Sequence, residues 1–465
     1  MDKNKILHMS DRIAMILMCV LMADIGIFGA GKVIFIGPLS FRHTLLLALA
    51  LASVPLMLSK WKELLRNPFM WMIGVFFVWV GVTAIMGYMN GHRMSLIITD
   101  IKGFAFFIFL PVFLCVVRTR ERVHTLMKTL IASSATLALI AVVCLIVYLC
   151  DRPALTAFSA YGYKIQFSRI GSITEHIPRL YFMSGLYMLC GCAFGIYFQV
   201  VEREKKHNWL YSVVTGLCLF AFLISYTRSV YLACAVTAVV TVISVLYKSD
   251  SVGRKNLLKH IAGAAAVCIC LILVFSLIAG TNYLSYAFSR TAVSLENGTN
   301  DSTTPSDPSQ PTDPSKEPWG EDEWKESYNK ETAQSDALRL VTTRELWQNI
   351  KKSPVIGLGL GAEIPSRPDG LNEYIYLDVW SKTGIVGLIL YFMPLFYMAW
   401  RVVKSKENDV SSANEKCVWI AALLGFMAYS YFNPYMNGSM GILLYCCVMS
   451  VTQPERKSLP EVSKN

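Results

Sequence analysis

Two arginines are the residues of this chain whose types and positions point most directly to chemistry. Arg228 lies in the segment SYTRSVYLA, a tight connection between two long apolar stretches. A cation there is costly unless it reaches the lipid headgroups or meets an anion. Arg344 lies in a polar segment between apolar blocks, and its guanidinium offers a planar fork that suits bidentate phosphate contact. Each arginine is interpreted either as an interfacial anchor or as a phosphate-binding cation.

An acidic patch follows Arg344 along the chain. Four carboxylates fall within sixteen residues and surround Asn372: Glu363, Asp369, Glu373 and Asp378. Paired carboxylates can act as a general base or bind a metal, whereas the plainer interpretation is a solvated loop. His176, just before an apolar stretch, is the histidine nearest to a plausible cavity, although a histidine at a helix edge is the simpler interpretation.

A glycine-rich segment, residues 357–361 (GLGLG), lies between Arg344 and the acidic patch. It resembles a phosphate-binding loop only superficially. It lacks the Gly-Lys-Ser/Thr ending, and no strand–loop–helix unit surrounds it. Glycines permit sharp turns and close approach of the backbone to a neighbour. The sequence therefore favours a structural turn.

The composition is that of a membrane protein. Of 465 residues, 54% are hydrophobic and only 16% are charged, against about 25% charged residues in soluble domains. A spanning helix needs about 20 mostly apolar residues. Twelve stretches qualify as candidate spans in an all-α polytopic fold: 13–30, 43–59, 69–89, 101–117, 126–149, 180–200, 209–226, 229–247, 260–279, 376–400, 417–432 and 438–452.

Basic residues predict the orientation of these spans. Lysine and arginine concentrate in every second loop, and such loops stay on the cytoplasmic side. Both termini are therefore expected in the cytoplasm. The predicted organisation is a bundle of about nine spans over 1–279, an extracytoplasmic loop over 280–375, C-terminal spans over 376–452 and a cytoplasmic tail over 453–465.

The long outer loop divides into two parts. Residues 297–318 are rich in proline, serine and aspartate, which predicts a disordered linker. Residues 332–352 have the periodicity of an amphipathic helix, with Leu340, Arg344 and Trp347 at i, i+4 and i+7. This face is expected to turn toward the membrane. Ser353-Pro354 ends the helix.

An ordered series of motifs resembles the O-antigen ligase and polymerase superfamily. These proteins are bacterial membrane glycosyltransferases that use polyprenyl-diphosphate-linked glycans. The resemblance covers roughly residues 165–450, and its motifs, in order, are Arg169-Ile-Gly171, Thr227-Arg228-Ser229, Arg344-Glu-Leu-Trp347, Pro354-Val-Ile-Gly357-Leu-Gly359, Asn372 with Gly384-Ile-Val-Gly387, and Phe432-Asn433-Pro434-Tyr435.

The resemblance implies a metal-independent glycosyltransferase of the bacterial cytoplasmic membrane that needs no cofactor. Its donor would be a polyprenyl-diphosphate-linked glycan and its acceptor a glycan or lipid-anchored molecule, with no role for nucleic acid. Arg228 and Arg344 would hold the diphosphate, and Arg169, Asn372 and His176 would complete the binding site.

One position departs from the family pattern. Ligases of this family place a histidine directly before the asparagine, and here that position is Leu371. Either Glu373 replaces the missing base, or the chain belongs to a polymerase branch with different acceptor chemistry, or its activity is altered. A polymerase that uses Glu373 is the favoured interpretation.

Other classes of membrane protein fit less well. A twelve-span transporter, or a flippase of lipid-linked oligosaccharide, is the main alternative. Major-facilitator carriers place their long loop in the cytoplasm after the sixth span, whereas here the long loop is expected outside, after the ninth. A non-catalytic scaffold remains a second alternative because of Leu371.

Overall fold

The structure is a computed structural model that describes residues 3–29, 35–36, 39–174, 177–201, 208–248, 251–285, 321–370, 372–404 and 410–453. The predicted linker at 297–318 and almost all of the predicted tail lie outside these residues. The described chain is nearly all helical, and every predicted apolar stretch contains a helix. The prediction of an all-α polytopic membrane protein is confirmed at this level.

Long helices make up most of the bundle. They are α1 (Lys3–Phe28), α2 (Phe41–Ser59), α4 (Pro68–Met89), α7 (Arg120–Cys150), α11 (Arg228–Lys248), α12 (Ser251–Ala279), α14 (Glu321–Lys352), α15 (Ile375–Lys404) and α16 (Val410–Ser430).

Shorter elements connect them or fill the centre. These are α3 (Trp61–Leu65), α5 (Met94–Phe104), α6 (Leu110–Val116), α8 (Arg152–Lys164), α9 (Met188–Val200), α10 (Asn208–Ile224) and α17 (Ser439–Thr452), with the 3₁₀ turns η1 (Ala105–Phe109), η2 (Gly185–Tyr187) and η3 (Pro434–Met436). The strands are β1 (Phe35–Ile36), β2 (Leu39–Ser40), β3 (Ser168–Thr174) and β4 (Ile177–Phe182).

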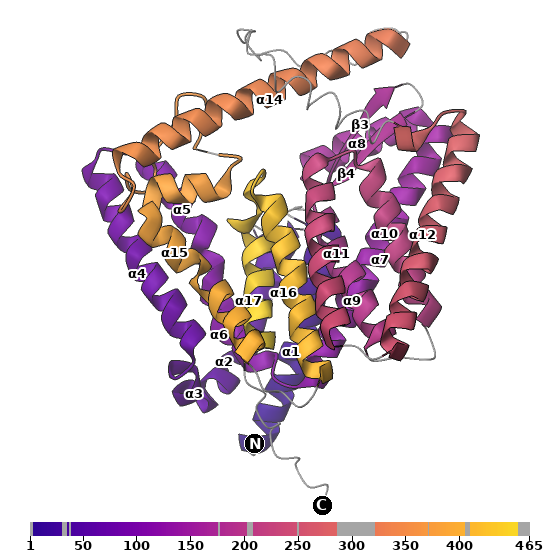
Figure 1. The fold of residues 1–465 in the computed structure, drawn as a ribbon. Coiled ribbons are helices and arrows are strands. Elements are labelled where there is room, and N and C mark those ends of the chain that lie inside the picture. Colours follow the sequence, from indigo (N-terminus) through magenta and orange to yellow (C-terminus); the bar gives the residue numbers. More distant parts are fainter. Residues whose placement is uncertain are drawn as a thin grey trace, which may run out of the picture.

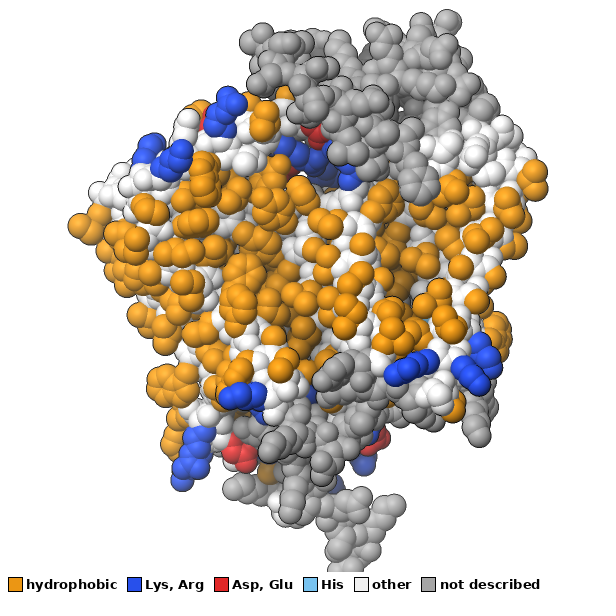
Figure 2. Space-filling view, in the orientation of Figure 1, with side chains coloured by type: hydrophobic (Ala, Val, Ile, Leu, Met, Phe, Trp, Pro, Cys, Tyr) orange, Lys and Arg blue, Asp and Glu red, His pale blue; other side chains and the backbone are white. Residues whose placement is uncertain are grey.

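By length and composition, seven helical segments of the described chain can cross a membrane, and three shorter apolar helical segments lie among them. The predicted number of twelve spans therefore stays a prediction. Figure 2 shows the corresponding surface, a broad apolar belt with charged side chains gathered above and below it. On α4, for example, Trp71, Val78 and Ile85 are all more than 60% exposed, which suits a helix that faces lipid.

The centre of the bundle is formed by α9 and α17, in which every residue except Ser439 is buried. The neighbouring helices α7, α10 and α16 close around them. The first residues of α1 and the last residues of α17 lie at the end of the bundle opposite α14 (Figure 1). The cytoplasmic location of both termini stays a prediction.

An antiparallel hairpin, β3–β4, interrupts the helical pattern where the sequence predicted the start of a span at 180. Its register pairs Arg169 with Tyr181 and Gly171 with Arg179. The span itself is short, because α9 begins only at Met188. The hairpin was missed because its second strand runs directly into the apolar stretch, so hydropathy alone merges the two.

Above the bundle, α14 lies across one end as a roof (Figure 1). The predicted helix at 332–352 is confirmed, and it begins earlier, at Glu321. Its C-terminal part packs on α15, and a separate small core lies there, formed by Leu346, Ile364 and Tyr374. The ion pairs of the candidate site lie along the underside of this helix.

Candidate functional site

The glycine-rich segment fastens the end of α14 to the membrane helices. After Lys352 the chain turns and supplies hydrogen bonds to a break in α15 at Gly384, whose backbone has φ 70° and ψ 179°. The Ile385 amide donates to the Pro354 carbonyl at 3.0 Å, and the Gly359 amide donates to the Lys382 carbonyl at 3.0 Å. The loop thus satisfies backbone groups that a straight helix would pair internally.

Close backbone approach explains the glycines. A Cβ added to Gly87 of α4 would lie 2.1 Å from the Leu360 carbonyl oxygen, and one added to Gly359 would lie 2.4 Å from the Gly87 nitrogen. Gly359 also has φ +92°, a conformation that favours glycine. The prediction of a structural turn is therefore confirmed, and the segment serves to position its neighbours.

A sealed ion-pair network lies beside this turn. The Lys382 Nζ contacts a carboxylate oxygen of Asp100 and one of Asp378, both at 2.9 Å. The other Asp100 oxygen accepts the Gly361 amide at 2.7 Å, and the Asn372 side chain donates to Asp378. We call Lys382, Asp100, Asp378 and Asn372 the sealed network. It joins α5, α15 and the segment that leads to Glu373.

The underside of α14 holds the loop that carries Arg367. The Glu345 carboxylate accepts from the Ser366 hydroxyl at 2.6 Å and from its amide at 3.0 Å. Leu346 and Ile350 are buried, 1% and 2% exposed. The buried face of α14 is therefore the one that carries Leu346 and Ile350.

The face that the sequence selected is the neighbouring one. Leu340 is 58% exposed, Trp347 is 44% exposed, and Arg344 is also exposed. Trp347 packs edge-on against Trp380 of α15, with ring centres 5.6 Å apart. The orientation of this stripe toward the membrane stays a prediction. Residues 339, 343, 346 and 350 have the same i, i+4, i+7 spacing shifted by one position. Continued by one turn, the first series reaches Lys351 and the second reaches Ile350. The apolar Ile350 is the buried residue of the two, so the second series forms the buried face.

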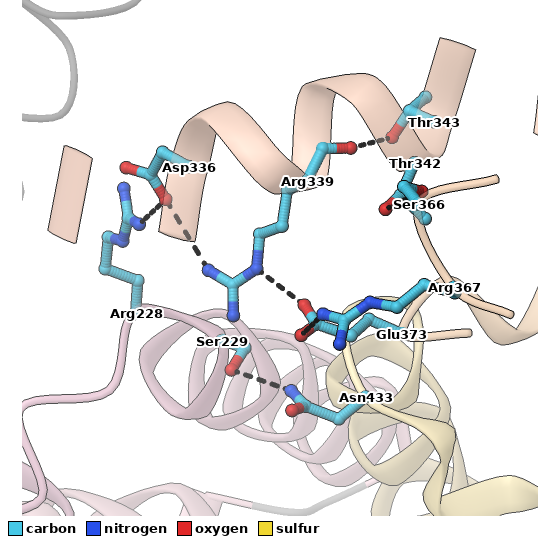
Figure 3. Close-up of polar contacts among 10 residues, drawn as sticks. All are labelled: Arg228, Ser229, Asp336, Arg339, Thr342, Thr343, Ser366, Arg367, Glu373 and Asn433. Carbon is cyan, nitrogen blue, oxygen red and sulfur yellow. Dashed lines mark hydrogen bonds and ion pairs between the residues drawn. The ribbon is translucent and has the colours of Figure 1, made fainter. Parts of the chain in front are cut away.

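Three arginines and two carboxylates meet beneath α14 (Figure 3). The Arg228 guanidinium donates to Asp336 at 2.6 Å, and Arg339 lies 3.5 Å from the same carboxylate. The Arg339 Nε donates to Glu373 at 2.9 Å, and Arg367 donates to the other Glu373 oxygen at 2.9 Å. We call this set the arginine cluster; it draws on α11, α14 and the loop before α15.

The arginine cluster is open to its surroundings. All five side chains are between 26% and 31% exposed. Burial alone would lower the pKa of Arg339, but its hydrogen bond to Glu373 and the charges of Glu373 and Asp336 raise it above its ordinary value. The Arg339 guanidinium therefore stays charged, and its fork can exchange a carboxylate for another oxyanion.

A second basic and aromatic group lies nearby on the β3–β4 hairpin. Paired residues of an antiparallel hairpin point to the same side, so Arg169, Arg179 and Tyr181 share one face. The Tyr181 hydroxyl lies 2.8 Å from the Tyr435 hydroxyl and also contacts that of Tyr429. Since Asn433 lies 3.5 Å from Ser229, the residue after Arg228, the hairpin group and the arginine cluster adjoin.

An apolar pocket lies next to this hairpin. It is small, with an accessible volume of about 10 Å³, and is lined by Tyr181, Leu186, Phe222, Ser225 and Val230 among others. Arg179 donates to the Ser225 carbonyl at 3.4 Å on its border. A basic surface and an apolar recess therefore lie side by side.

The predicted site residues are distributed unevenly around this centre. Arg228 and Glu373 are brought together in the arginine cluster, whereas Arg344 is exposed on α14 and is not part of the cluster. Asn372 is buried in the sealed network, next in sequence to Glu373. Arg169 is exposed on the hairpin, its guanidinium 5.9 Å from the Tyr163 ring centre.

Two of the predicted positions, His176 and Leu371, lie outside the described residues. The residues that sequence reasoning missed are Asp336, Arg339 and Arg367. Arg339 was detectable in principle, because it shares the phase of Leu346 and Ile350. Within the described ranges, no group of three metal-ligating side chains comes together.

Comparison with known families bears directly on this arrangement. Residues 213–392 match the family model Wzy_C, described as O-Antigen ligase. The chain contains an O-antigen ligase domain. This domain runs from α10 into α15 and includes Arg228, Arg339, Arg367 and Glu373, so the whole arginine cluster lies within it. A search of curated proteins found no match.

Proposed function

We propose that the chain is a membrane glycosyltransferase that transfers or polymerises glycan units from a polyprenyl-diphosphate carrier at the outer face of the cytoplasmic membrane. Polymerisation is favoured over ligation. The observation that carries the proposal is the arginine cluster: three guanidinium groups from separate parts of the O-antigen ligase domain meet at one accessible point.

The charge balance of the cluster suits a diphosphate. Among the described side chains, three guanidinium groups pair with two carboxylates, Asp336 and Glu373. A diphosphate carries more charge than a carboxylate and can take bidentate contacts from each guanidinium. A diphosphate bound in the arginine cluster would displace Glu373 from Arg339 and Arg367. The Glu373 carboxylate would then be available to a second substrate.

The proposed reaction balances without a cofactor. The acceptor hydroxyl gives its proton to the Glu373 carboxylate while its oxygen forms the new bond to the anomeric carbon of the donor sugar. The bond between that carbon and the phosphate oxygen breaks, and the polyprenyl diphosphate leaves. Arginines directed at the developing negative charge stabilise the transition state, which is usually the largest catalytic contribution.

The surroundings support a lipid-linked substrate. The apolar residues beside Arg179, among them Leu186 and Phe222, offer a surface that suits the prenyl tail, and the exposed side of the arginine cluster would admit the sugars. We further propose twelve spans with both termini in the cytoplasm, which places α14 and the arginine cluster outside. Arg169 and Asn372 would contribute to substrate binding, Asn372 through its place beside Glu373, and His176 remains a proposed contact.

The experiment is to identify the lipid-linked glycans that accumulate when Arg228→Ala replaces the wild-type chain in a deletion strain. We expect loss of surface polysaccharide at normal protein levels, with single repeat units on the carrier if the chain is a polymerase and long chains if it is a ligase. Unchanged surface polysaccharide would reject the proposed enzyme. Accumulation of repeat units at the inner face alone would indicate a flippase instead.

A further inference from the structure

The short connection between α4 and α5, residues 90–93, reaches across to the glycine-rich segment. The Asn90 side chain donates to the Leu358 carbonyl at 2.9 Å. The His92 Nδ1 lies 2.9 Å from the Leu360 carbonyl oxygen. These side-chain contacts fix the connection beside the chain that leads from α14 to α15.

Arg93 ends this connection, and its guanidinium joins two points of the loop over residues 363–370. Its Nε donates to one Glu363 carboxylate oxygen at 2.6 Å, and its Nη2 donates to the other at 2.8 Å, which makes a bidentate pair. The same Nη2 also donates to the carbonyl of Pro368, the residue directly after Arg367. The guanidinium fork of Arg93 therefore closes the loop that carries Arg367.

The loop has a fixed local shape of its own. The Arg367 amide donates to the Ile364 carbonyl at 3.0 Å, and the Gly370 amide donates to the Arg367 carbonyl at 3.1 Å. These backbone bonds hold the turn together but do not attach it to the bundle. Contacts from neighbouring elements, those of Arg93 among them, determine where the loop lies and how Arg367 is directed.

Neither membrane anchoring nor stability explains this use of an arginine. Arginines at the ends of membrane helices usually extend to headgroups or water, whereas the fork of Arg93 is directed at its own chain. The Arg93 side chain is 56% exposed and that of Glu363 is 33% exposed. Exposed ion pairs contribute little to stability, but a bidentate pair fixes orientation as well as distance.

We propose that Arg93 is a positioning residue, which holds Arg367 in place for the glycan-transfer reaction. This inference rests on the proposed function. Arg367 donates to Glu373 at 2.9 Å, so a displaced loop would move a cation that faces the diphosphate and also change the surroundings of the proposed base. Arg93 acts only through the loop and contacts no substrate in this proposal.

The test measures glycan transfer in a double-mutant cycle of Arg93→Ala and Arg367→Ala. Arg93→Ala alone is expected to lower the transfer rate about tenfold, because misplacement of a substrate-positioning group by about 1 Å is costly. In the Arg367→Ala background the same change is expected to cost less than about twofold, because the group that it positions is gone. The unfolding midpoint of Arg93→Ala is expected to stay within about 2 °C of wild type.

Equal losses from Arg93→Ala in the two backgrounds would overturn the proposal, as would full activity of Arg93→Ala alone. Arg93→Lys keeps the charge without the fork and is expected to recover only part of the rate. If Arg93→Ala does not fold, Glu363→Gln replaces it in the cycle. It weakens the same pair and leaves the Pro368 contact, so its loss is expected to be smaller but to show the same dependence on Arg367.

Lys351→Ala is the matched control, because Lys351 is an exposed cation of α14. It is expected to change transfer by less than about twofold, and a loss as large as that of Arg93→Ala would overturn the proposal. Arg339→Ala, measured in the same assay, separates the two hypotheses. If it loses transfer while Arg93→Ala keeps it, only the positioning role fails. If both variants keep full transfer, the proposed function fails as well.

Discussion

The arginine cluster and the sealed network meet at adjacent residues, Glu373 and Asn372, yet they differ in how far they are removed from solvent. In the arginine cluster every side chain is at least 26% exposed. In the sealed network the Lys382, Asp100 and Asp378 side chains are 4%, 15% and 10% exposed. The cations of the arginine cluster are guanidinium groups, whereas the cation of the sealed network is the Lys382 ammonium group.

This difference separates a site that can exchange partners from one that holds the structure together. Exposed ion pairs contribute little to stability, so their partners can be replaced at small cost. Loss of one partner from a buried pair leaves an uncompensated charge, which is strongly destabilising. The sealed network therefore fixes the position of Asn372 and Glu373, while the arginine cluster stays available to a ligand.

The largest expected effect is on stability, in the variant Lys382→Met. It leaves Asp100 and Asp378 buried without their cation, which costs about 3–5 kcal/mol in the free energy of unfolding. Thermal unfolding in detergent measures it. The control Lys351→Met removes an exposed lysine from α14 and is expected to change stability by less than about 0.5 kcal/mol. Equal stability of the two variants would contradict a structural role for the sealed network.

The second prediction concerns activity in the arginine cluster. Arg339→Ala is expected to lower the rate of glycan transfer by about 100-fold, as for loss of one donor that stabilises developing charge. Its effect on the unfolding midpoint is expected to be small, because the ion pair is partly exposed. Arg339→Lys keeps the charge but loses the bidentate fork and is expected to recover only part of the rate. Full activity of Arg339→Ala would remove this residue from the site.

The third prediction separates proton transfer from donor binding. Glu373→Gln is expected to lower transfer by about 100-fold or more, since it removes a general base. Binding of a polyprenyl diphosphate is expected to be retained or strengthened, because a competing carboxylate has left Arg339 and Arg367. Asp369→Asn, on the same loop and exposed, is the matched control. Retained transfer in Glu373→Gln would reject its role as base.

The smallest expected effect tests the choice between the two arginines of α14. Arg344 is exposed and is not part of the arginine cluster, so Arg344→Ala is expected to lower transfer by less than about threefold, within the range of surface substitutions. The measurement is the same transfer assay used for Arg339→Ala. A larger loss from Arg344→Ala than from Arg339→Ala would restore the pairing of Arg228 with Arg344 that the sequence suggested.

Hydropathy predicted most of the fold because each helix that faces lipid needs a long apolar run. It failed at the β3–β4 hairpin, where Ile177–Phe182 continues directly into apolar residues. It also gave no indication of the broken path of α5, η1 and α6, since a kinked and a straight apolar segment have the same composition. The turn at 357–361 was predictable because repeated glycine has few other uses outside a strand–loop–helix unit.

The candidate site was predictable only in part. Arg228 was identified as a cation between two apolar stretches, and Glu373 as a carboxylate close to Leu371, the position of the family's histidine. The choice of Arg344 over Arg339 depended on a helical phase, and a shift of one residue in phase turns the chosen side chain by about 100°. Lys382 and Asp100 were missed because their pairing joins positions 282 residues apart, a contact that no local pattern encodes.

The two ends of the described part of α14 are attached to the bundle in different ways. Near Lys352, α14 is followed by a segment whose main-chain groups bond to α15, whereas near Arg339 it is held by ion pairs between side chains. If the donor binds as proposed, it would break the ion pairs at Arg339 and leave the backbone bonds in place. We would then expect α14 to pivot at Ser353-Pro354 and to separate from the bundle at the end near Arg228.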